Sequence, residues 1–171
     1  RVHDGADVTS VWDEAKARTG IASIVADSEA AVGDDGVWPL HPLDRGPDDP
    51  PVFSGVYLGA AGIAWALHQL GTRLDVVSIV DAAIRRGPDF PGEDASLFGG
   101  EGGMQLVART LGAGYDEERL RALVRANERH PARELLVGSP GTILAAQFAG
   151  LDDEWRHAAE ILVAETDDDG R

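Results

Sequence analysis

Cysteine is absent from the 171-residue sequence, and this absence limits the chemistry that the chain can perform. Without a thiol it can form no disulfide, hold no metal ion through thiolates and offer no cysteine nucleophile. Long apolar runs are missing too, and none approaches the ~18 residues that span a bilayer. The first residues, Arg1-Val2-His3-Asp4-Gly5, contain no apolar core of a secretion signal. We therefore expect a cytoplasmic protein.

Basic residues are also scarce. The 15 lysines and arginines stand against 30 aspartates and glutamates, which gives a net charge of −15. Such a field repels phosphate backbones and anionic lipids, so binding to nucleic acid or to a membrane is not expected. Hydrophobic residues form 43% of the chain, which is enough to build the core of one domain over residues 1–171.

An internal repeat built on paired glycines is the most informative feature of the sequence. Residues 56–63, 97–104 and 135–142 align without gaps around a Gly-x-x-Gly motif. The pairs are Gly59 and Gly62, Gly100 and Gly103, and Gly138 and Gly141. An apolar stretch of small residues follows each pair, and it ends at Gly71, Gly112 or Gly150, twelve residues after the first glycine. Repeats with matched flanks indicate one structural unit used several times.

Glycine chemistry and residue periodicity predict helices around these motifs. The paired glycines permit close backbone approach or a positive φ, and each closing glycine suits a left-handed helix cap. Residues 63–67 have almost no polar face, so their helix is expected to be buried on most sides. Amphipathic helices are predicted at about 8–31, 74–86, 116–130 and 152–164, and no strand pattern is present. The fold class is therefore all-α, either an open solenoid or a closed α/α toroid.

Two segments are predicted to be surface loops. Residues 33–54 are rich in proline and aspartate, and Val37, Trp38 and Leu40 are expected to anchor them. Residues 89–95 form the second loop, directly before the second glycine motif.

Three strings resemble bacterial lanthionine synthetase C-like (LanC-like) proteins. They are Tyr57-Leu58-Gly59-Ala60-Ala61-Gly62-Ile63, Ser96-Leu97-Phe98 and Glu134-Leu135-Leu136-Val137-Gly138-Ser139-Pro140-Gly141. The similarity extends from the helix near Trp12 to Asp169-Gly170. It implies a double-layered α/α toroid whose Gly-x-x-Gly turns lead into the inner helices. Members have seven helix pairs, so this chain would supply about three of them, as the N-terminal part of an incomplete ring.

The resemblance also implies a chemistry, that of lantibiotic biosynthesis. Members add a peptide cysteine thiol to dehydroalanine or dehydrobutyrine, and a zinc ion lowers the pKa of that thiol. Their zinc ligands, two cysteines and a histidine, and a catalytic histidine lie in later repeats and have no counterpart here. We therefore expect no metal in this chain, zinc in the full-length protein, and no cyclase activity from this segment alone.

Four residues are candidates for a site in the central cavity of the toroid. Glu134 lies just before the third glycine pair, where lantibiotic cyclases often carry Asp; it is either a catalytic acid or a helix-start acid bonded to backbone amides. Glu101 would face the same cavity and share acid and base roles with Glu134, or be an exposed turn acid. His68 and Trp65 would line the cavity, or serve as core residues.

Two other functions stay open. A catalytically silent member would bind a peptide, glutathione or a partner protein. A sugar-processing enzyme on an α/α toroid would need two acids at the cavity, with Glu101 and Glu134 as the candidates. An incomplete ring would expose apolar helices, which predicts a dimer or an association with the missing C-terminal repeats.

Overall fold

The protein, as a computed structural model, is described for residues 12–43, 45–47 and 50–166, and this part of the chain contains helices and no strand. The helices are α1 (Glu14–Ala31), α2 (Ala60–Gln69), α3 (Val76–Arg86), α4 (Glu101–Leu111), α5 (Glu117–Asn127), α6 (Ser139–Ala149) and α7 (Asp152–Glu165). The predicted all-α class is thereby confirmed for the described residues. The predicted start of the first helix, at residues 8–11, lies outside them.

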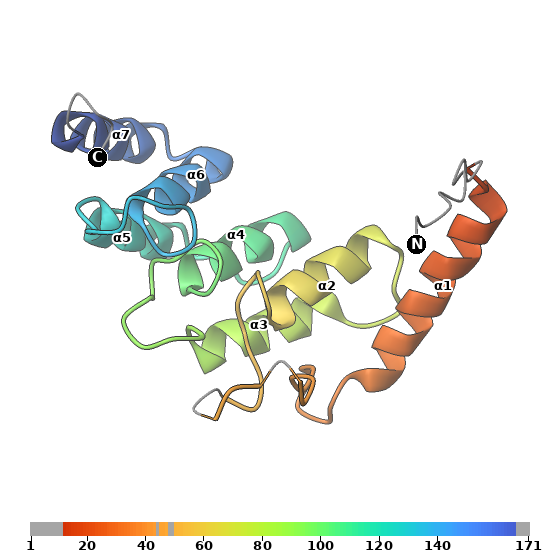
Figure 1. Cartoon of the computed structure of the whole chain (residues 1–171). Helices are drawn as coiled ribbons and strands as arrows, with labels where there is room; N and C mark the ends of the chain where they lie inside the picture. Colours follow the sequence, from red (N-terminus) through yellow and green to blue (C-terminus); the bar gives the residue numbers. More distant parts are fainter. Residues whose placement is uncertain (1–11, 44, 48–49, 167–171) are drawn as a thin grey trace, which may run out of the picture.

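Helices α2 to α7 form two rows, and α1 lies apart from them. In the first row α2 packs on α4 and α4 packs on α6, while α3, α5 and α7 cover these helices in the second row. Figure 1 shows the same succession, with the yellow, green and blue helices following one another away from α1. The predicted alternation of amphipathic and small-residue helices along the chain is therefore present, and α2, α4 and α6 each pack on amphipathic helices of the second row.

Two clusters of apolar side chains hold the rows together. The first lies among α2, α3 and α4 and includes Met104 and Val80, both 0% exposed. The second lies among α5, α6 and α7 and is centred on Leu120, which is also 0% exposed. Alanines fill the space between the helices of the first row, and their small side chains let the backbones approach closely.

Helix α2 is less buried than its sequence predicts. It buries Ala60, Ala61, Ala64 and Leu67, whereas Trp65 is 45% exposed. The prediction that this helix is buried on most sides is therefore wrong for the described part of the chain. Only the face toward α3 and α4 is covered there, and a helix without a polar face presents its remaining apolar side chains to solvent.

The first predicted loop is anchored as expected. Val37 is 0% exposed and belongs to the first cluster. The Trp38 indole Nε1 donates a 2.8 Å hydrogen bond to the Ser28 carbonyl of α1. Leu40 N donates to the Pro51 carbonyl at 3.1 Å, which closes the loop on itself.

Candidate functional site

Helices α2, α4 and α6 begin differently from α1, α3 and α5. The N-caps of α1, α3 and α5 are Asp13, Asp75 and Asp116, whose carboxylates accept backbone N–H bonds. The N-caps of α2, α4 and α6 are the first glycines of the three motifs, in extended conformation and without a side-chain bond. Something other than a capping side chain therefore decides the residue type at these three helix starts.

The second glycine of each pair is required because the backbone passes directly over it. A β-carbon on Gly62 would overlap the Val56 carbonyl oxygen, and one on Gly103 would overlap that of Leu97. A β-carbon on Gly141 would overlap the carbonyl of Leu135 in the same way. Each of these carbonyls lies six residues before its glycine. The predicted close approach is thus confirmed, while a positive φ is not used in these pairs.

The closing glycines take the predicted left-handed conformation. Gly71, Gly112 and Gly150 have φ values of 79°, 71° and 73°. Gly112 and Gly150 are the C-caps of α4 and α6, and each donates its N–H to carbonyls of the last helical turn.

We define turns one, two and three as residues 55–62, 96–103 and 134–141. Their first residues, Gly55, Ser96 and Glu134, stand four positions before the first glycine of each pair. In turn two, Ser96 Oγ accepts hydrogen bonds from Phe98 N at 3.2 Å and Gly99 N at 3.1 Å. Glu134, the equivalent residue of turn three, also binds amides of its own turn.

Glu134 performs this task with its carboxylate. Its oxygens accept hydrogen bonds from Leu136 N at 2.6 Å, Val137 N at 2.9 Å and Gly138 N at 3.2 Å. These backbone bonds, led by that of Val137, lower the pKa of the Glu134 carboxyl group. The group is therefore ionised at neutral pH.

In turn one, the carboxylate comes from the loop before turn two and binds other amides. Asp89 Oδ1 accepts hydrogen bonds from Ser54 N at 2.5 Å and Gly55 N at 3.0 Å. A β-carbon on Gly55 would collide with Asp89 Oδ2. Burial raises the pKa of Asp89 in spite of these bonds.

Hydrogen bonds join the three turns side by side. Val56 N and Tyr57 N of turn one both donate to the Phe98 carbonyl of turn two, at 2.7 and 3.1 Å. Ser96 Oγ of turn two donates to the Leu136 carbonyl of turn three at 2.6 Å. The turns therefore form one continuous row along the starts of α2, α4 and α6.

A pocket of about 300 Å³ lies in this row. We name it the turn pocket. Its apolar lining residues are Tyr57, Leu58, Phe90, Phe98, Leu136 and Val137. Tyr57 is 67% exposed and Leu58 52% exposed, so the rim is open to solvent. Asp89, Glu93 and Ser96 are its polar lining residues, which gives an apolar hollow with carboxylates on its wall.

The predicted site residues lie outside this pocket. Glu101 begins α4, where its Oε2 binds Arg119 Nη2 at 2.6 Å and its Oε1 accepts from Gln105 Nε2 at 3.2 Å. Glu134 binds amides of its own turn, so the two acids have different partners. His68 and Trp65 are exposed on α2. The catalytic and cavity-lining roles assigned to these four residues stay predictions.

Asp89 and Glu93 were not singled out by the sequence. The sequence showed that the fourth position before the glycine pair is Ser96 and Glu134 in turns two and three but Gly55 in turn one. That difference did not identify Asp89, because Asp89 binds the Ser54 and Gly55 amides rather than amides further along the turn. The sequence gives no signal for Glu93.

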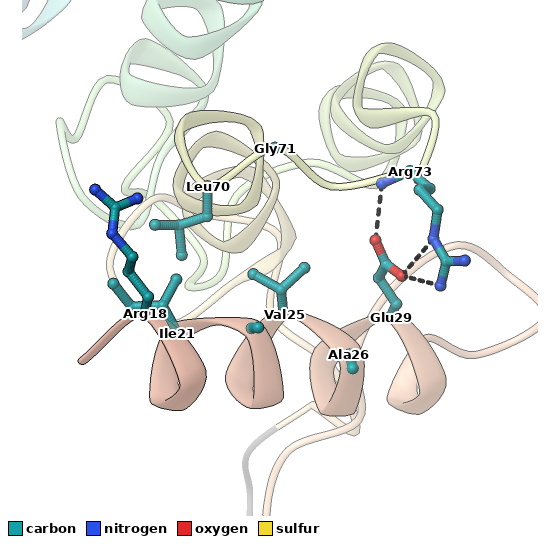
Figure 2. Close-up of a pocket in the computed structure, with 9 residues that line it drawn as sticks. Arg18, Ile21, Val25, Ala26, Glu29, Leu70, Gly71 and Arg73 are labelled. Atoms are coloured by element: carbon teal, nitrogen blue, oxygen red, sulfur yellow. Dashed lines mark hydrogen bonds and ion pairs between the residues drawn. The ribbon is translucent and has the colours of Figure 1, made fainter. Parts of the chain in front are cut away.

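A second hollow, of about 480 Å³, lies between α1 and the end of α2. Figure 2 shows Ile21 and Val25 of α1 turned toward Leu70, with the Glu29–Arg73 pair beside them. Glu29 accepts hydrogen bonds from Arg73 N at 2.7 Å and Arg73 Nη2 at 2.7 Å. These bonds to Arg73 lower the pKa of Glu29 to about 2. The hollow is thus a seam between α1 and the end of α2, and the Glu29–Arg73 ion pair joins its two sides.

The described part of the chain offers neither a metal-binding cluster nor a membrane-spanning helix. Among residues 12–43, 45–47 and 50–166, no group of three or more His, Cys, Asp or Glu side chains is placed to hold a metal ion. Within these ranges no helix is long and apolar enough to cross a membrane.

Comparison with known proteins gives one informative similarity. No protein-family description and no solved structure matches the chain. A protein of Streptomyces coelicolor described as a probable SapB synthase is 33% identical to it over 95 residues. The aligned region is 55% of this chain and 10% of that protein. The chain is therefore similar to a small part of a much longer synthase.

Proposed function

We propose that the chain is part of a LanC-like cyclase region within a longer lanthipeptide synthase. Residues 1–171 would form about three of the seven helix-pair repeats of an α/α toroid, with α2, α4 and α6 in the inner layer. The observation that carries the proposal is the row of three hydrogen-bonded glycine turns at the starts of these helices. The similarity to a probable SapB synthase supports it independently.

The proposed reaction adds a cysteine thiol of a peptide to dehydroalanine or dehydrobutyrine. A carbon–sulfur bond forms at the β-carbon, and the α-carbon takes up a proton. Zinc, when bound, would supply a thiolate at neutral pH. The described residues do not fit such a site, since the chain has no cysteine and these residues hold no ligand cluster. No step of the reaction is therefore assigned to a metal held by this chain.

This chain would bind and position the peptide. Glu134 holds the amides of turn three, and its lowered pKa keeps it an anion. We assign it anchoring of the turn as its first role and help with proton transfer at the cavity as its second. The turn pocket would receive side chains of the peptide beside the cavity.

A cyclisation assay tests the proposal. The longer gene product, incubated with its dehydrated precursor peptide, should consume peptide thiols, and their loss is counted by alkylation and mass spectrometry. Residues 1–171 alone should leave every thiol free to react with the alkylating agent. Thiols that persist with the longer protein, or that disappear with residues 1–171 alone, would contradict the proposal.

A non-catalytic function is the second candidate, and exposed apolar side chains favour it. Trp65, Leu70 and Phe148, on or at the ends of α2 and α6, are 45%, 44% and 66% exposed. Such side chains suit contact with further repeats, a second copy or a partner protein. Light scattering on residues 1–171 tests this, because a dimer supports such contact and a monodisperse monomer opposes it.

A further inference from the structure

We infer that the turn pocket binds the basic side chain, lysine or arginine, of a peptide segment. Asp89 and Glu93 would face the cationic group while the apolar lining holds the stem of the side chain and its neighbours. The inference names the feature of the peptide that the site recognises, so it rests on the proposed function.

The carboxylates are held together on one wall of the pocket. The side of Gly99 that would carry a β-carbon faces Glu93 Oε2 at 3.5 Å, the Phe90 ring at 3.6 Å and Asp89 Cβ at 3.8 Å. Glu93 therefore lies beside Asp89 and over a backbone position that has no side chain. The turn pocket, of about 300 Å³, is lined by both acids together with residues of all three turns.

Neither carboxylate has a cationic partner among the described residues. Three other acids with little exposed side chain do have one: Glu29 binds Arg73, Glu101 binds Arg119, and Glu154 binds Arg121 and Arg125. Burial of Asp89 raises the pKa of its carboxyl group, although the hydrogen bonds from the Ser54 and Gly55 amides act in the opposite direction. A cationic ligand would supply the missing countercharge.

The rest of the lining suits the stem of such a side chain. Tyr57 and Phe98 lie edge to face, with ring centroids 5.9 Å apart. None of the residues that line the pocket is basic. Lysine and arginine bury their methylene groups against apolar surfaces and keep the charged end at polar groups, and both make cation–π contacts with aromatic rings. The net charge of −15 adds long-range attraction for a basic peptide.

Binding of short peptides to the full chain tests the inference. The probes are acetyl-Ala-Phe-Lys-Phe-Ala-amide and the same peptide with norleucine in place of lysine, measured by isothermal titration calorimetry. The lysine peptide should bind about tenfold more tightly, because a hydrogen bond to a charged group adds roughly that factor. Equal affinity for the two peptides would overturn the inference.

Two variants locate the site. Glu93→Gln should weaken binding of the lysine peptide about fivefold and leave the norleucine peptide unaffected. Asp94→Asn is the matched control. It removes the same charge at the next residue, whose side chain does not line the pocket. Equal weakening by both variants would overturn the inference, because it would assign the effect to net charge.

A third variant blocks the pocket without touching its charges. Gly99→Leu places its β-carbon at ordinary contact distance from its neighbours and extends into the hollow. It should abolish binding of both peptides while the circular dichroism spectrum is retained. Unchanged binding in that folded variant would contradict the assignment.

Binding is measured without ring formation, so the inference and the proposed function fail separately. If the chain discriminates lysine from norleucine while the longer protein closes no rings, the proposed function is wrong and the basic-side-chain pocket stands. If rings form and the two peptides bind equally, the pocket assignment is wrong.

Discussion

Helix α1 and the body of α2–α7 illustrate two ways in which a helix can be attached to a protein. The body buries side chains completely, as at Leu120 and Met104, and its turns are joined by backbone hydrogen bonds. Helix α1 is the longest, with 18 residues, yet it buries none of them. It is fastened by the Glu29–Arg73 pair and by the Trp38–Ser28 bond. The length of a helix therefore does not indicate how firmly it is packed, whereas small residues and glycines at close contacts do.

The largest expected effect is at the glycine turns. Gly103→Ala should destabilise the chain by about 4 kcal/mol or more, because its methyl group would overlap the Leu97 carbonyl. Gly20→Ala is the control, since nothing lies within 4 Å of a β-carbon there, and it should stabilise α1 by about 0.5–1 kcal/mol. Urea unfolding followed by circular dichroism measures both variants. A Gly103→Ala protein as stable as the original would contradict the close-approach explanation.

A smaller difference in the free energy of unfolding is expected between truncation of a buried and of an exposed aliphatic side chain. Leu120→Ala, at a position 0% exposed, should cost about 3 kcal/mol through lost burial and a cavity. Ile24→Ala in α1, at a position 61% exposed, should change the free energy of unfolding by less than about 0.5 kcal/mol. Similar losses in the two variants would mean that α1 is packed as tightly as the body.

The left-handed cap of α4 should contribute less again. Gly112→Ala keeps open space around the new methyl group but forces alanine to a φ of 71°, which costs about 1 kcal/mol. The midpoint of urea unfolding should fall accordingly without a change in slope. An unchanged midpoint would show that the end of α4 adopts another conformation.

The smallest effect concerns the seam of α1 and depends on pH. The Glu29 pKa is lowered from 4.5 to about 2 by its bonds to Arg73. Its stabilisation is therefore complete above about pH 4.5 and is lost as the pH falls toward 2. The tryptophan fluorescence of the original protein should change over this range, and Glu29→Gln should remove that part of the change. Arg18→Gln, which breaks an exposed pair within α1, should leave the titration as it was.

The helices were largely predictable from the sequence because the chain marks their ends twice. Asp75 and Asp116 cap α3 and α5, and Gly112 and Gly150 end α4 and α6. The constant spacing of Gly112 and Gly150 behind their glycine pairs was enough to recognise them as helix ends. The alignment of three glycine pairs likewise predicted equivalent turns, and they proved to share the same backbone contacts.

The site was harder to predict because it is made between turns. Asp89 acts on turn one from 34 residues away, at Gly55, and no local pattern reveals such a partner. The exposure of Trp65 was missed for a related reason. Sequence shows that a helix has no polar face, but only the packing of its neighbours decides which apolar side chains are covered.

Amide hydrogen exchange at Val56 and Tyr57 tests the row of turns most directly. Both amides donate to the Phe98 carbonyl of the neighbouring turn, although the Tyr57 side chain is 67% exposed. We predict that both exchange as slowly as the amides within α2 and α4, because they open only when the turns separate. Exchange at the rate of free loop amides would contradict a continuous row, and with it the arc of repeats on which the proposed cyclase depends.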